Sequence, residues 1–102
     1  MDRQALEKML EQGGDNPLLR YTLGTLCLKA GDAEAAVGHL EAALRQDPGH
    51  SASWKQLGRA LAGLGRLEEA QTAYKQGIAT AEAKGDIQAA KEMKVFLKRL
   101  EK

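Results

Sequence analysis

The chain has 102 residues, and its 15 lysines and arginines against 14 aspartates and glutamates leave a formal net charge of +1. A chain of this length forms one small domain with its own core. Such a balanced charge creates no field that would gather nucleic acid or an anionic membrane surface. A single cysteine cannot form an internal disulfide. No segment approaches the ~20 apolar residues that span a bilayer, and the N-terminus lacks the apolar core of a secretion signal. We therefore expect a cytoplasmic protein without nucleic-acid or membrane partners.

The composition predicts an all-α fold. Alanine, leucine, glutamate, lysine and glutamine dominate, β-branched residues are scarce, and the only prolines are Pro17 and Pro48. Apolar residues recur at helical spacing in six segments, which are separated mostly by glycines that read as helix stops. Because the links between segments are short, consecutive helices must run antiparallel and pack as neighbours.

The first three predicted helices fall between residues 1 and 46. Asn16, which precedes Pro17, and Asp32 are expected to cap the second and third, because their side chains accept hydrogen bonds from free amides of the first turn. The sequence Asp47-Pro48-Gly49 ends the third helix. The three apolar stripes are Leu6, Met9 and Leu10, then Leu19, Leu23, Leu26 and Cys27, then Ala36, Val37, Leu40, Ala43 and Leu44.

The last three predicted helices follow from residue 51 onward. Ser51 and Asp86 are the expected caps of the fourth and sixth, and Gly65 and Gly85 are the expected stops of the fourth and fifth. Their stripes are Trp54, Leu57, Leu61 and Leu64, then Leu67, Ala70, Tyr74, Ile78 and Ala81, then Ile87, Ala90, Met93, Leu97 and Leu100.

Two stretches of the chain repeat one another, because residues 17–50 align with residues 51–84. Gly24 and Gly58 lie in the middle of predicted helices, where glycine costs about 1 kcal/mol relative to alanine. Such a cost is tolerated where another helix passes too close for a Cβ atom, so we expect a close helix crossing at both glycines. The matched pairs are Leu23 with Leu57, Gly24 with Gly58, Gly31 with Gly65, Glu34 with Glu68, and Ala36 with Ala70.

This pattern resembles the tetratricopeptide repeat (TPR). The second unit carries the pattern as Trp54, Leu57, Gly58, Leu61, Gly65, Ala70, Tyr74 and Gly77, and the first as Leu23, Gly24, Cys27, Gly31, Asp32, Ala36, Leu40, Ala43 and Pro48. The departures are Arg20 in place of an aromatic residue, Gly77 in place of alanine and Glu82 in place of proline. The last two predict that the fifth helix runs past the usual end of a repeat.

The resemblance implies a single TPR-like domain, an antiparallel helix-hairpin solenoid of six helices. Residues 1–14 are the expected N-terminal flanking helix, which matches the second half of a repeat. Residues 17–50 and 51–84 are the expected repeats one and two. Residues 86–101 are the expected C-terminal capping helix, with Lys91, Lys94 and Lys98 on a charged outer face.

The residue types that perform catalysis or bind metal have no partners at useful spacing. His39 and His50 have no cysteine or carboxylate at the spacing of metal ligands, so we expect His39 on a solvated face and His50 in a turn. Cys27 is expected to be a buried apolar thiol. We expect no histidine close enough to activate Cys27 or a serine. The sequence therefore predicts no enzyme activity, no cofactor and no metal site.

In TPR proteins the first helix of each repeat lines a concave groove that holds an extended peptide or a partner helix. The resemblance places this groove here on Tyr21, Thr22, Thr25 and Leu28, and on Lys55, Gln56, Arg59 and Ala62. Lys55 and Arg59 are four residues apart, so they project from one face of a helix, where an acidic peptide would offset their repulsion. A solvated basic face is the alternative interpretation. The groove also resembles the carboxylate clamp of chaperone-binding TPR domains, but Tyr21 and Thr25 stand at two of its positions and a third repeat is missing.

These observations favour a non-catalytic protein-interaction adaptor with a peptide or protein partner. The residues Trp54, Leu57, Gly58, Tyr74, Leu23 and Gly24 are expected in the core and not in the site. The alternative function is a structural module that self-associates into homo-oligomers, because a short solenoid exposes apolar edges at its ends.

Overall fold

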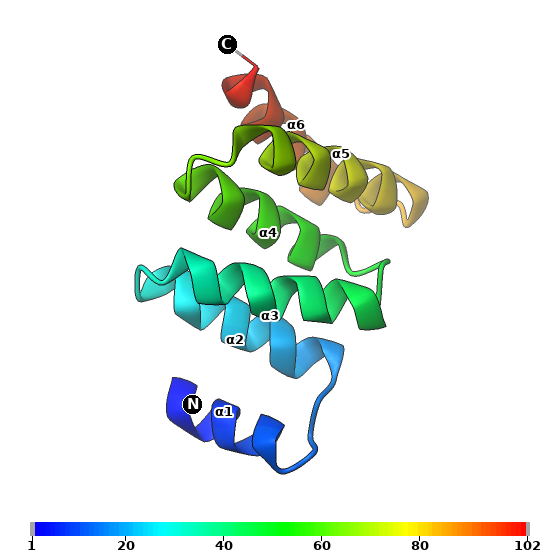
Figure 1. Cartoon of the computed structure of the whole chain (residues 1–102). Coiled ribbons are helices and arrows are strands. Elements are labelled where there is room, and N and C mark those ends of the chain that lie inside the picture. Colours follow the sequence, from blue (N-terminus) through cyan, green and yellow to red (C-terminus); the bar gives the residue numbers. More distant parts are fainter. Residues whose placement is uncertain (1, 102) are drawn as a thin grey trace.

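The computed structural model describes residues 2–101, which form six α-helices that follow one another as antiparallel neighbours (Figure 1). This confirms the predicted all-α architecture, and Met1 of the predicted first helix lies outside the described residues. The helices are α1 (Arg3–Glu11), α2 (Pro17–Lys29), α3 (Ala33–Gln46), α4 (Ser51–Gly63), α5 (Leu67–Ala83) and α6 (Ile87–Leu100). The α2–α3 and α4–α5 hairpins fall within residues 17–50 and 51–84, and the assignment of whole repeats to these ranges stays a prediction.

Most helix starts are fixed by capping side chains. The predicted caps Asn16, Asp32 and Asp86 each accept a hydrogen bond from the backbone amide three residues later, and Asp2 caps α1 in the same way. The prediction for Ser51 is wrong, because Ser51 already belongs to α4 and lies buried. The turn that precedes α4 is closed by a bond from the backbone amide of residue 50 to the carbonyl oxygen of residue 47, and it leads directly into the helix without a side-chain cap.

The first helices of the two hairpins end on the same motif. Gly31 and Gly65 have φ angles of 82° and 76°, a region that suits glycine because it has no Cβ. The amides of Asp32 and Arg66 then donate back to the carbonyl oxygens of Cys27 and Leu61, at 2.8 and 2.9 Å. These bonds satisfy carbonyl groups that the helix leaves free, so each chain reverses within a few residues.

A large side chain sits over the predicted mid-helix glycine of each hairpin. A Cβ atom at Gly24 would lie 2.6 Å from Cγ of Leu40, and one at Gly58 would lie 2.5 Å from Cε1 of Tyr74. The expectation of a close approach at these glycines is therefore right, but a side chain of the facing helix makes the approach, not its backbone. Leu40 and Tyr74 are buried, so neither can move away without opening a cavity.

The fifth helix is longer than the third, with 17 residues against 14, as the departures from the repeat pattern predict. Gly77, one of those departures, has a structural reason. A Cβ atom there would clash with Sδ of Met93 from α6 and would lie 2.7 Å from Cβ of Trp54. Met93 is fully buried and anchors α6 against α5, so the glycine makes room for the last helix.

Some residues of the predicted apolar stripes are not in the core. Leu67 and Ile87 are the first residues of their helices and are 46% and 66% exposed, and Met9 of α1 is also exposed. Trp54, predicted to be core, is only half-buried. Its Cβ faces α5, while its indole N–H donates to the carbonyl oxygen of Pro48 at 2.8 Å, in a solvent-exposed position.

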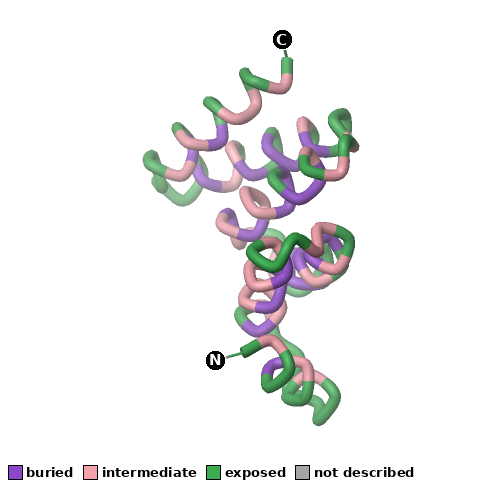
Figure 2. The backbone as a smooth tube through the Cα atoms, turned by 90° about the vertical axis from the view of Figure 1, so that its left-hand side faces the viewer, coloured by how far each residue is buried: buried purple, intermediate pink, exposed green. Residues whose placement is uncertain are grey.

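The arrangement of the helices gives the molecule two different faces. Figures 1 and 2 show α3 and α5 on one side of the molecule and α2 and α6 on the other, with α4 between them. Both α2 and α6 contact α4, whereas no Cα atoms of α3 and α5 approach within 8 Å. The helices therefore spread apart on the α3–α5 side, which we call the outer face, and come together on the α2–α4–α6 side, which we call the concave face.

We predict that Gly58→Ala lowers the free energy of unfolding by about 1–3 kcal/mol, because the new methyl group would overlap the Tyr74 ring. The matched control is Gly38→Ala in α3, where no atom lies within 4 Å of the new Cβ. This variant is expected to gain about 0.5–1 kcal/mol from the better helix propensity of alanine. Urea unfolding of both variants measures the difference. Equal effects of the two substitutions would contradict the packing described here.

Candidate functional site

The predicted groove residues lie on α2 and α4, which contact each other on the concave face. All of them are half-buried except Arg59, which is exposed. Tyr21, Leu28 and Ala62 pack against the edge of the main core, which makes the floor of this face partly apolar. The hydroxyl groups of Thr22 and Thr25 donate to backbone carbonyl oxygens of their own helix, both at 2.8 Å, so their oxygens remain available as acceptors.

Lys55 is held by an ion pair that the sequence did not predict. Its Nζ lies 3.0 Å from Oε1 of Glu92, which α6 brings to the concave face. The two side chains keep 26% and 42% of their surface exposed, so the pair contributes about 0–1 kcal/mol. No repeat position pointed to Glu92, because α6 lies outside the repeated segment; only the packing of α6 on α4 reveals it.

Arg59 is the more accessible cation of the predicted pair. It lies one turn after Lys55, is exposed, and donates a 3.3 Å hydrogen bond to Oε1 of Gln56 on its own helix. It makes no ion pair within the part of the chain that the structure describes. On the concave face, Glu92 therefore neutralises the charge of Lys55, whereas no ion pair among the described residues neutralises that of Arg59.

His50 lies in the turn before α4, as predicted, and contacts two polar side chains. Its ring lies edge-on to Tyr21 with the centroids 5.0 Å apart, and Nδ1 lies 2.7 Å from Oγ of Ser53. The expectation that no histidine lies beside a serine is therefore wrong, because one helical turn joins these two residues. Ser53 is fully buried, so a substrate cannot reach its hydroxyl group, and the contact is structural.

His39 is not on a solvated face, contrary to the prediction. It is half-buried, and its Nδ1 lies 3.2 Å from Nη1 of Arg20, which takes the place of the expected aromatic residue. Because a guanidinium group only donates, His39 accepts this bond through an unprotonated Nδ1. Burial, followed by the charge of Arg20, holds the pKa of His39 below its ordinary value. Arg20 also binds both carboxylate oxygens of Asp15, at 2.9 and 3.0 Å, and lowers the pKa of Asp15 to about 2.

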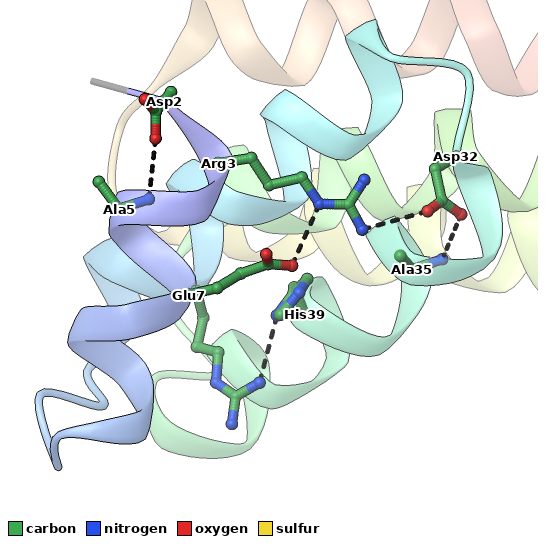
Figure 3. Close-up of polar contacts among 8 residues, drawn as sticks. Asp2, Arg3, Ala5, Glu7, Asp32, Ala35 and His39 are labelled. Atoms are coloured by element: carbon green, nitrogen blue, oxygen red, sulfur yellow. Dashed lines mark hydrogen bonds and ion pairs between the residues drawn. The ribbon is translucent and has the colours of Figure 1, made fainter.

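Ion pairs of Arg3 connect α1 to the rest of the molecule. Arg3 donates to Oε2 of Glu7 at 3.2 Å and to Oδ2 of Asp32 at 3.1 Å, as Figure 3 shows. Asp32 also caps α3 through the amide of Ala35. One carboxylate thus both starts α3 and holds α1 against the α2–α3 turn. Leu6 is the one residue of α1 that is buried, and it packs with Leu19 and Leu23 of α2.

The remaining chemical groups offer little reactivity. Cys27 is buried as predicted, and burial raises the pKa of its thiol, which keeps it protonated. Among residues 2–101, no group of three histidine, cysteine or acidic side chains could hold a metal ion. The same residues include no helix long and apolar enough to pass through a membrane. Lys91, Lys94 and Lys98 are exposed on α6, and Lys94 pairs with Glu82.

Two adjoining hollows lie on the outer face, where the sequence did not predict a site. Their volumes are about 440 and 370 Å³, and they share Glu41, Trp54 and Leu57. We call the two together the outer groove; α3 and α5 form its sides and α4 its floor. A smaller hollow of about 230 Å³ lies between α1 and α2, beside Met9 and Leu18. The signal for this site in the sequence is Trp54, which the apolar stripe and the repeat pattern assign only to the core.

Comparisons with known proteins give one consistent result. Two family models, both described as tetratricopeptide repeat, match residues 28–93 and 3–51. The TPR repeat-containing protein PA0015 of Pseudomonas aeruginosa is 52% identical over 99 residues, which cover 97% of this chain and 94% of that protein. The solution structure of protein BPP2914 from Bordetella parapertussis has a TM-score of 0.85 and 46% identity, covering 98% of this chain and 87% of that one. A tetratricopeptide repeat domain protein from Salinibacter ruber, solved by crystallography, has a TM-score of 0.77 and 28% identity, covering 83% of this chain and 96% of that one.

The environment of His39 predicts a pH-dependent stability. Its ordinary pKa is 6.5 and its folded pKa is lower, so the unfolded chain binds more protons between these two values. The free energy of unfolding is therefore expected to fall as the pH is lowered below about 6.5, and His39 should contribute no dependence above that range. Urea unfolding at about pH 7.5 and about pH 5.5 measures this. His39→Gln is expected to flatten the dependence, while His50→Gln, which retains His39, is expected to keep it. An unchanged slope in His39→Gln would show that the burial of His39 is not the cause.

Proposed function

Because the chain belongs to the tetratricopeptide repeat family, which generally provides protein–protein interaction modules, we propose that it is a non-catalytic adaptor that binds a peptide or partner helix on its concave face. This proposal rests on one observation, that Lys55 and Arg59 lie together on the partly apolar concave face. A ligand that combines carboxylates with apolar side chains complements these groups.

The contact between Lys55 and Glu92 gives the proposed binding a definite mechanism. Glu92 occupies the position that a ligand carboxylate would take beside Lys55. Because both side chains are partly exposed, exchanging one carboxylate for another leaves the ion pair intact and costs little. Arg59 needs no exchange and offers a planar guanidinium that can bind a carboxylate through two hydrogen bonds.

We also propose a cytoplasmic location and the absence of enzyme activity, cofactor, nucleic-acid partner and membrane partner. The single buried Cys27, which forms no internal disulfide, supports a reducing compartment. The balanced net charge of +1 supports the absence of a nucleic-acid partner. The TPR family, which is typically non-catalytic, supports the absence of enzyme activity.

Self-association stays the second candidate function, and one feature of the N-terminal end favours it. Met9 and Leu18 are 45% and 67% exposed and border the hollow between α1 and α2. Apolar surface of this kind can be covered by a second copy of the chain.

We predict that a short blocked peptide of alternating glutamate and leucine binds the native protein, as measured by isothermal titration calorimetry. The double variant Lys55→Glu and Arg59→Glu is expected to abolish this binding, because both cations that face the ligand are reversed. Glu92→Gln is expected to strengthen it, because Lys55 then has no internal partner to give up. Arginine in place of glutamate in the peptide is the specificity control. Unchanged affinity in the double variant would show that the ligand does not use the concave face.

A further inference from the structure

The outer groove combines an apolar floor with a single aromatic wall. Trp54 lines both hollows, with Leu57 on the floor shared by the two and Leu44 and Leu61 at either end. Each hollow is large enough to receive one or more side chains of a ligand. The Trp54 ring is fixed in place, because its N–H bonds to the carbonyl oxygen of Pro48 and its Cβ packs over Gly77.

The sides of this groove are acidic. Glu41 of α3 and Glu68 and Glu69 of α5 line it, against one lining cation, Arg45. Glu69 is paired with Arg66 at 2.6 Å, whereas Glu41 and Glu68 make no ion pair among residues 2–101. Both are exposed, so their carboxylates are available to a ligand. The charge of the outer groove is thus opposite to that of the concave face.

We propose that the outer groove is a second binding site, which accepts an extended cationic peptide segment that carries arginine or lysine next to an apolar side chain. The apolar side chain lies on the Leu57 floor. A cationic side chain lies across the face of Trp54, where the ring attracts positive charge, and reaches the carboxylates of Glu41 and Glu68. The protein then holds two segments of opposite charge on opposite faces, and the two sites share α4. This inference does not depend on the concave face binding a peptide.

The test uses Trp54 as its own reporter, since it is the only tryptophan in the chain. A short blocked peptide in which arginine and leucine alternate is titrated against the full chain while tryptophan fluorescence is followed. We expect a saturable change that weakens at higher salt, because exposed charges are screened. The double variant Glu41→Gln and Glu68→Gln preserves the shape of the groove and is expected to raise Kd about threefold to tenfold.

Three controls separate this site from the others. Glu92→Gln, which removes the carboxylate beside Lys55 on the concave face, is expected to bind the arginine–leucine peptide as well as the native chain does. The glutamate–leucine peptide is expected to leave the Trp54 emission unchanged. Sedimentation of the protein alone, with and without the two glutamine substitutions, tests whether a second copy of the chain fills the groove.

The proposal is overturned if no saturable change occurs up to ~1 mM peptide, or if the glutamine variant keeps the native Kd. It is also overturned if the protein alone forms an oligomer that the glutamine variant dissolves, because the occupant is then another copy of the chain. Loss of binding only in Glu92→Gln would place the peptide on the concave face instead, because Glu92 is the carboxylate that a cationic peptide would use there.

Discussion

The arrangement of this protein depends on one type of contact, a bulky side chain seated on a helix where glycine leaves no Cβ. Leu40 sits on Gly24, and Tyr74 sits on Gly58 in the second hairpin. Met93 of α6 does the same at Gly77. Each contact lets two helix surfaces approach more closely than two ordinary side chains would allow, and the same geometry recurs along the stack. The burial of Tyr74 also raises its pKa to about 12, so the ring stays neutral in the core.

The same contacts determine what the surface can bind. Gly77 lies under both Met93 and the Cβ of Trp54, so it fixes the position of α6 and of the aromatic wall of the outer groove at once. The position of α6 in turn brings Glu92 to Lys55 on the concave face. The two faces therefore differ in charge because of side chains on α3 and α5 on one side and on α4 and α6 on the other, while the packing that supports both is shared.

The repeat pattern was enough to predict the fold, because glycine and small residues at fixed spacing mark the places where one helix surface must receive another. Three of the predicted caps, the helix stops and the long fifth helix are all local properties of the sequence, and all are confirmed. Two errors are local, the Ser51 cap and the contact of His50 with Ser53, and the others concern contacts between helices. The partner of Lys55 is on a helix outside the repeat, and the partner of His39 is Arg20, which departs from the repeat pattern. The apolar stripe and the repeat pattern assign Trp54 to the core, but α3 and α5 spread apart and its side chain stays half-buried.

The most direct test of the central contact is a double-mutant cycle of Gly58→Ala with Tyr74→Val, measured by urea unfolding. Valine has no atoms beyond Cγ, so the ring atoms that would meet the new methyl group are gone. The account predicts that the destabilisation by Gly58→Ala disappears in the Tyr74→Val background, which corresponds to a coupling of about 1–3 kcal/mol. Effects that add within about 0.5 kcal/mol would contradict it, because Gly58 would then be required for some reason other than the side chain above it.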